Sequence, residues 1–183
     1  MILALTGSAG SGKDTVAEHL VGKGFKKYVY SDYIRAELEK EDKPANRNNL
    51  IEKGNEIRKK YGAGELSLRI LVDIDKDSAK HFVLVGVRNP EEISKLRQRK
   101  NFALWFVDAP LEIRYERIKN RKSIKDVIDF EQFKEQEERE NSSDPNSQQL
   151  KSVAVLAEET LQNSGDLKFL HQQIDKQLSK IDL

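Results

Sequence analysis

The sequence predicts an α/β fold in which a five-stranded parallel sheet lies between two layers of helices. Short apolar runs alternate along the chain with longer polar stretches of helical character. Continuous apolar runs such as Val83-Leu84-Val85-Gly86-Val87 suit strands that helices bury on both faces. A glycine-rich segment directly follows the first run and precedes a helical stretch, which is the order expected of a strand, a tight loop and a crossover helix.

Each strand is expected where an apolar run meets turn residues or a polar stretch. The expected strands are 2–6, 27–30, 82–86, 104–108 and 159–162. The expected helices are 13–22, 32–40, 47–60, 65–75, 90–99, 110–122, 130–140 and 166–180. Pro90 and Pro110 stand at first helical positions, and Gly22 and Gly24 stand where the first helix should stop. Segment 147–157 fits a helix or a strand, and we favour a helix.

Length and composition narrow the class of protein. The 183 residues suit one domain over 1–183, because neither an internal repeat nor a long linker divides them. The 32 Lys and Arg against 31 Asp and Glu give a net charge of +1, which argues against binding to nucleic acid or to a membrane surface. The absence of cysteine excludes disulfides, thiolate catalysis and zinc–sulfur sites.

The N-terminal apolar run is too short for a signal peptide or a membrane span. We therefore expect a cytoplasmic protein, as a monomer or a small homo-oligomer. Two polar inserts interrupt the alternation of strands and helices. Residues 32–80 hold about three helices and are expected to cover an acceptor, and residues 119–147 are expected to form a lid. Composition alone fits a surface helical hairpin at 119–147 equally well.

The strongest motif is Gly7-Ser8-Ala9-Gly10-Ser11-Gly12-Lys13, which has the pattern G-x-x-x-x-G-K. Its glycines let successive N–H groups point at phosphate oxygens, the following helix presents its positive N-terminal end, and the lysine reaches the β- and γ-phosphates. The alternative without a function is a glycine-rich turn with a solvated lysine, but such a turn would not require small residues at Ser8, Ala9 and Ser11. The candidate nucleotide-binding residues are Gly7, Ser8, Ala9, Gly10, Ser11, Gly12, Lys13, Asp14 and Thr15.

The residue after Lys13 is Asp14, where the motif usually has a Ser or Thr that holds magnesium, and Thr15 follows one position later. The third strand ends at Gly86 and lacks the acidic residue that commonly helps to bind magnesium at this position. Magnesium can therefore be held through Asp14, through Thr15, through a water bridge from either, or through Asp32.

Two further sites follow strand ends, where doubly wound sheets bind ligands. Asp32 and Arg35 follow the second strand, and Arg88 follows the third. The arginines can pair with an anionic acceptor, and Asp32 can act as a base or hold magnesium. In the plain alternative, Asp32 caps a helix and Arg88 bonds loop carbonyls.

Arg114, Arg117 and Arg121 share one helical face, because their spacing is i, i+3 and i+7. Such a face can clamp a triphosphate. The candidate catalytic residues are Lys13, Asp32, Arg117 and Arg121. Tyr33, Tyr61 and Trp105 are expected to serve packing.

Taken in order, these motifs resemble the nucleoside-monophosphate-kinase-like branch of P-loop kinases, which includes adenylate kinases, deoxynucleoside monophosphate kinases and dephospho-coenzyme A kinases. The form G-K-D-T at 12–15 is shared with some of these proteins. The resemblance implies ATP and Mg²⁺ as cofactors, and it implies that Asn163 and Gly165, after the fifth strand, border the adenine. It further implies transfer of the γ-phosphoryl of ATP to a small phosphorylated acceptor, either a nucleoside monophosphate or dephospho-coenzyme A.

An alternative from another class is a nucleotide-dependent switch or ATPase whose helical inserts bind a protein partner. The arginines on the acceptor side count against it. An RNA-linked nucleotide kinase fits poorly with the balanced charge.

Overall fold

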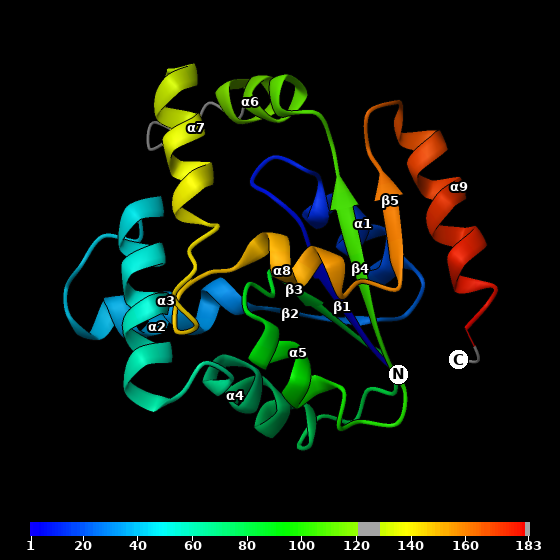
Figure 1. Cartoon of the computed structure of the whole chain (residues 1–183). Coiled ribbons are helices and arrows are strands. Elements are labelled where there is room, and N and C mark those ends of the chain that lie inside the picture. Colours follow the sequence, from blue (N-terminus) through cyan, green and yellow to red (C-terminus); the bar gives the residue numbers. More distant parts are fainter. Residues whose placement is uncertain (121–128, 182–183) are drawn as a thin grey trace.

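The computed structural model describes residues 1–120 and 129–181 (Figure 1). Five parallel strands form one sheet in the order β2-β3-β1-β4-β5. The strands are β1 (Ile2–Thr6), β2 (Lys26–Val29), β3 (Phe82–Val85), β4 (Phe102–Asp108) and β5 (Glu159–Gln162). The described helices are α1 (Lys13–Gly22), α2 (Tyr30–Lys40), α3 (Arg47–Tyr61), α4 (Glu65–Ile74), α5 (Pro90–Leu96), α6 (Leu111–Asn120), α7 (Phe130–Arg139), α8 (Leu150–Val155) and α9 (Leu167–Leu178).

The predicted α/β class is confirmed, and segment 147–157 contains a helix, α8, as favoured. Several expected boundaries differ from the structure by one to three residues, and the difference at Tyr30 has a structural reason. Residue Tyr30 was expected to end the second strand, but it begins α2. Its ring is buried under the sheet, and its hydroxyl forms a hydrogen bond with Ser67 in α4. Burial of this side chain turns the chain into the helix earlier than the apolar run suggests.

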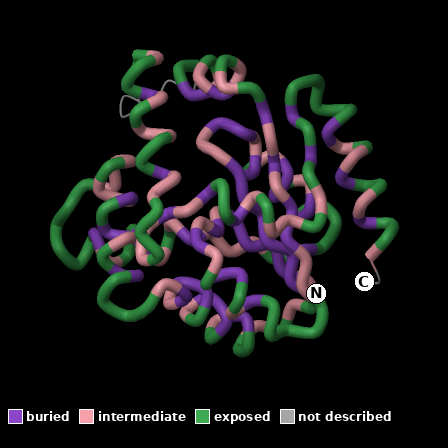
Figure 2. The backbone as a smooth tube through the Cα atoms, viewed as in Figure 1, coloured by how far each residue is buried: buried purple, intermediate pink, exposed green. Residues whose placement is uncertain are grey.

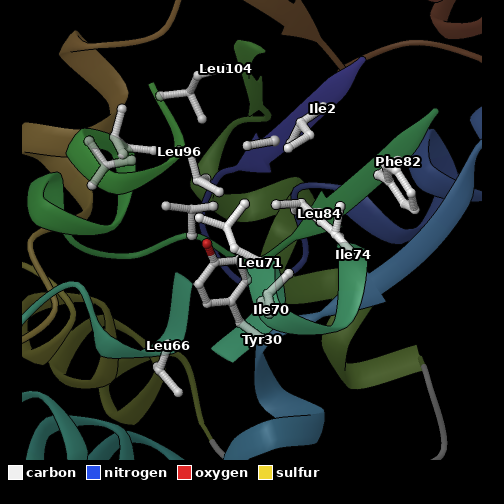
Figure 3. Close-up of a cluster of buried hydrophobic side chains, with 14 of the residues drawn as sticks. Ile2, Tyr30, Leu66, Ile70, Leu71, Ile74, Phe82, Leu84, Leu96 and Leu104 are labelled. Carbon is white, nitrogen blue, oxygen red and sulfur yellow. The ribbon is translucent and has the colours of Figure 1, made fainter. Parts of the chain in front are cut away.

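Two apolar clusters cover the two faces of the sheet. Successive side chains of a strand point to opposite faces, so Leu3 and Leu5 pack against α1 and α9, whereas Ala4 packs on the other side. That other side carries α2, α4, α5 and α8, and Figure 3 shows Tyr30 among the aliphatic side chains of this cluster. Buried residues accordingly run through the strands and along the inner sides of the helices (Figure 2).

The first insert, 32–80, contains α2, α3 and α4, the number of helices expected. Part of this insert belongs to the core, because Leu66, Ile70 and Leu71 of α4 are buried against the sheet. The second insert, 119–147, includes α7, which lies between α6 and α3 near the carboxyl ends of the strands (Figure 1). In the described part of the chain, no helix is long and apolar enough to cross a membrane.

A buried ion pair fixes the loop after β3. Arg58 of α3 donates from Nε and Nη2 to one oxygen of Glu92, at 2.9 and 2.8 Å. The other oxygen of Glu92 accepts the backbone N–H groups of Arg88 and Asn89, at 2.8 and 3.1 Å. The side chains of Arg58 and Glu92 are 1% and 0% exposed. Glu92 also completes the capping box that begins α5, so this pair sets the course of the backbone at Arg88.

Replacing Arg58 with methionine should lower the free energy of unfolding by about 3–5 kcal/mol, because it leaves the Glu92 carboxylate buried without its cation. Urea denaturation measures the loss. The control is Lys59→Met at the exposed neighbouring position, which should change the stability by less than about 0.5 kcal/mol. Equal effects of the two substitutions would show that the buried pair does not hold this loop.

Candidate nucleotide and acceptor site

The loop between β1 and α1 is built from glycines that no larger residue can replace. Gly7, Gly10 and Gly12 have φ angles of +147°, +78° and +98°. A Cβ atom on Gly10 would lie 2.5 Å from the backbone oxygen of Arg114, and one on Gly12 would lie 2.0 Å from the side-chain nitrogen of Asn163. The loop therefore fits tightly against α6 and the segment after β5, and its shape suits a cradle of backbone N–H groups.

Lys13 is folded over this loop. Its Nζ donates hydrogen bonds to the backbone oxygens of Gly7 and Ser8, at 2.7 and 2.8 Å. Burial and the nearby charge of Arg88 lower the pKa of Lys13 to about 7, although the charge of Glu140 opposes this shift. A triphosphate beside Lys13 would restore the ammonium form, because an anion favours the charged state.

Arg117 and Asn163 bind the loop from the other side. Arg117 of α6 donates to the backbone oxygens of Gly10 and Asn163, at 3.4 and 2.8 Å. Asn163, which is buried, donates from Nδ2 to the backbone oxygen of Ser11 at 2.7 Å. Gly165 lies two residues further on and is exposed.

The structure corrects the expectation that Arg114 shares a phosphate-clamping face with Arg117. Arg114 is only 8% exposed, and it donates to the backbone oxygens of Ala109 and Ala9 and to Glu137 of α7 at 2.6 Å. Arg114 therefore stabilises the phosphate loop through Ala9 and α7 through Glu137. The third member of the predicted face, Arg121, lies outside the described residues.

A cavity of about 630 Å³ opens beside the loop and joins it to the predicted acceptor side. Of the predicted residues other than the loop glycines, those that line it are Ala9, Lys13, Asp14, Arg35 and Arg88. Asp32 does not line it; its exposed carboxylate accepts from Arg35 at 2.7 Å on the surface of α2. The cavity therefore contains the phosphate-loop lysine and the acceptor-side arginines in one space.

Glu140, at the end of α7, is the buried anion of this cavity. Its carboxylate accepts from Nη2 and Nε of Arg47, at 2.8 and 3.3 Å, and forms an ion pair with Arg88. Burial alone would raise the pKa of Glu140, but the charges of Arg88 and Arg47 outweigh it and lower the pKa to about 2. Glu140 thus remains ionised between two guanidinium groups from distant parts of the chain.

Aromatic packing holds α7 in the same place. Phe133 is fully buried, and the guanidinium groups of Arg47 and Arg114 lie 5.6 and 5.7 Å from its ring centre. Tyr115 of α6 packs against the same ring, at a centroid distance of 5.8 Å. These contacts connect α7 to both α3 and α6, and the cavity lining includes Arg47 of α3 and Glu140 at the end of α7.

The cavity residues that were not predicted from the sequence include Arg47, Arg58, Glu140 and Gln148. The sequence contained a signal for the position of Arg47: Asn46 is a typical N-cap residue, and a helix that begins after it places Arg47 in the first turn of α3. Glu140 is one of several acidic residues in a charged run, and nothing in that run distinguishes the carboxylate that is buried.

The predicted metal ligands do not gather into a cluster. Among the described residues, no group of three or more His, Asp or Glu side chains could hold a metal ion. Asp14 and Thr15 lie side by side in the first turn of α1, and only Asp14 lines the cavity. A magnesium site that phosphate oxygens complete is compatible with these residues.

Gly10→Ala should abolish nucleotide binding, because the new Cβ would lie 2.5 Å from the backbone oxygen of Arg114, so that either α6 or the loop must move. The matched control is Gly24→Ala. Gly24 has a similar φ of +94°, but no atom lies within 4 Å of its added Cβ. Both changes carry the backbone strain of a left-handed alanine, so a difference between them isolates the close contact. Titration calorimetry with ATP measures the affinity; equal affinities for the two variants would refute the tight fit.

Solved kinases share this fold. A shikimate kinase from Bacteroides thetaiotaomicron superposes with a TM-score of 0.62 at 12% sequence identity, covering 98% of this chain and 97% of that one. A gluconokinase from Sinorhizobium meliloti superposes with a TM-score of 0.54 at 14% identity, covering 97% and 91%. At these identities the similarity shows a P-loop kinase-like fold.

Sequence relatives give the family. A UPF0200/UPF0201 protein from Archaeoglobus fulgidus is 30% identical over 98% of this chain, which spans 55% of the length of that relative. A UPF0200 protein from Sulfurisphaera tokodaii is 35% identical over 71% of each chain. Residues 3–143 match the family described as AAA domain. The chain therefore belongs to the UPF0200 proteins and carries an AAA domain.

Proposed function

We propose that this protein is an ATP-dependent kinase that transfers the γ-phosphoryl group to a small phosphorylated acceptor. The observation that carries the proposal is the shared cavity, which has the phosphate loop and Lys13 on one side and Arg35, Arg47 and Arg88 on the other. A switch or ATPase needs the first half of this cavity only. A kinase needs both halves in one space, because the two substrates must meet.

The loop fits the phosphates of ATP. Its glycines allow the close approach described above, and the hydroxyl oxygen of Ser11 is buried with no hydrogen-bond partner in the described part of the chain. Lys13 and the loop N–H groups would hold the β- and γ-phosphates, with Arg117 and Arg121 neutralising the charge that develops during transfer. Asn163 and Gly165 would border the adenine.

Magnesium would be held by Asp14 or Thr15 together with phosphate oxygens, because Mg²⁺ commonly uses one or two protein ligands and substrate phosphates. When bound, Mg²⁺ would stabilise the negative charge on the phosphate oxygens during transfer of the γ-phosphoryl group. Asp32, the other predicted ligand, lies outside the cavity lining.

The acceptor side favours a phosphate over a hydroxyl as the attacking group. A hydroxyl acceptor needs a base, and Asp32, the expected base, forms a surface ion pair with Arg35. An acceptor phosphate is already ionised and needs positioning alone. Planar guanidinium groups such as those of Arg88 and Arg47 bind phosphates bidentately. A nucleoside monophosphate therefore fits this arrangement better than dephospho-coenzyme A.

Water must be kept from the γ-phosphate, because hydrolysis competes with transfer. Segment 119–147 is the proposed lid, and α7 already contacts α3 through Arg47 and Glu140. An acceptor phosphate would compete with the Glu140 carboxylate for the same guanidinium groups. The shared fold with a shikimate kinase and a gluconokinase supports phosphoryl transfer as the reaction.

The proposal predicts that ADP release from ATP is accelerated about tenfold or more by at least one acceptor in a panel of nucleoside and deoxynucleoside monophosphates and dephospho-coenzyme A. A coupled assay measures ADP release. Slow hydrolysis that no acceptor accelerates would contradict a kinase and would favour the switch or ATPase that binds a protein partner.

In the same assay, Arg88→Lys tests the acceptor side. Lysine keeps the positive charge beside Glu140 but loses the planar fork, so KM for the acceptor should rise about tenfold while KM for ATP changes little. Arg97→Lys is the control, because Arg97 forms an exposed ion pair with Glu158 away from the cavity.

A further inference from the structure

Gln148 lines the acceptor half of the cavity, and its side chain contains a buried polar atom that has no hydrogen-bond partner among the described residues. Gln148 lies between α7 and α8, is only 6% exposed and lines the cavity together with Arg47, Arg88 and Glu140. Its amide oxygen, Oε1, is buried and accepts no hydrogen bond within the described part of the chain. Buried side-chain oxygens are normally hydrogen-bonded, so an unpaired one needs an explanation.

The backbone around Gln148 is held firmly against the loop that carries Arg88. The N–H group of Gln149 donates to the backbone oxygen of Arg88 at 2.8 Å. Asn89 donates from Nδ2 to the backbone oxygens of Pro145 and Ser147, at 2.7 and 2.9 Å. The backbone oxygen of Gln148 itself accepts from Ser142 at 3.0 Å. Gln148 is therefore fixed beside the arginine that is expected to bind the acceptor anion.

The position of Gln148 distinguishes it from the other residues that have an unpaired buried polar atom. In the described ranges, five buried side-chain polar atoms have no hydrogen-bond partner, on Ser11, His81, Glu137, Gln148 and Gln177. Of these five residues, Gln148 is the one that lines this cavity. The oxygen of Gln177, on α9, provides a chemically identical atom elsewhere in the molecule.

We infer that Gln148 determines acceptor specificity: its amide oxygen accepts a hydrogen bond from an N–H or O–H group that the acceptor carries beside its anionic group. The inference rests on the proposed kinase function and adds the chemistry of the acceptor. An anion alone would satisfy Arg47 and Arg88 but would leave Gln148 unpaired. A group that can only accept hydrogen bonds would place its oxygen or nitrogen against Oε1 and would be rejected.

The test combines a change in the protein with a change in the acceptor. Gln148→Met keeps the length of the side chain and removes its oxygen. The acceptors are the most active monophosphate of the panel and analogues that each lack one donor: the 2′-deoxy form, the 3′-deoxy form and the form without the amino group of the base. For each pair, kcat/KM is measured with the wild type, Gln148→Met and the control Gln177→Met.

In the wild type and in Gln177→Met, removal of one particular donor should lower kcat/KM about tenfold or more, because Oε1 is then left unpaired. In Gln148→Met, the complete acceptor should lose a similar factor, and removal of the same donor should cost nothing further. Gln148→Asn, which stays polar but is too short to reach, should behave like Gln148→Met. If Gln148→Met does not fold, Gln148→Asn provides the same comparison.

Two results would overturn the inference while leaving the kinase function intact. One is a wild type for which every analogue is as good as the complete acceptor. The other is a Gln148→Met enzyme that discriminates among the analogues as the wild type does, including a uniform loss for all of them. If no acceptor accelerates ADP release by the wild type, the proposed function itself fails, and this inference fails with it.

Discussion

The carboxylate of Glu140 connects three parts of the chain that are far apart in sequence: the end of α7, the start of α3 and the loop after β3. Burial of an ionised carboxylate is costly unless cations and hydrogen bonds compensate. Arg47 and Arg88 provide that compensation, and their charges keep the pKa of Glu140 at about 2. All three residues line the cavity beside the phosphate loop, so this contact lies at the wall of that cavity.

The nucleotide side depends on the same set of charges. Lys13 is affected both by Arg88 and by Glu140, so its protonation reflects the state of the acceptor half. Arg114 connects α7 to the phosphate loop through Glu137 and Ala9. A ligand that binds either half of the cavity would therefore change the electrostatic surroundings of the other half.

Local features of the fold were predictable from the sequence, whereas contacts across the chain were not. The phosphate loop is encoded in seven consecutive residues, and the capping box at Asn89 and the turn to α5 follow from neighbouring positions. Helical periodicity placed Arg114 and Arg117 on one face, but it does not tell which of them the fold buries. The pairing of Arg47 with Glu140 spans 93 residues, and no local pattern specifies it.

The ionised, buried carboxylate of Glu140 holds Arg47 and Arg88 in place, and the pH dependence of stability tests this most directly. The folded pKa of about 2 lies below the ordinary value of 4.5, so the carboxylate contributes stability above pH 4.5, and this contribution is lost as the pH falls toward 2. Glutamine does not titrate. Urea unfolding should therefore show that the wild type's advantage over Glu140→Gln shrinks by about 2 kcal/mol from about pH 5 to about pH 3. An advantage that stays constant over this range would contradict the account.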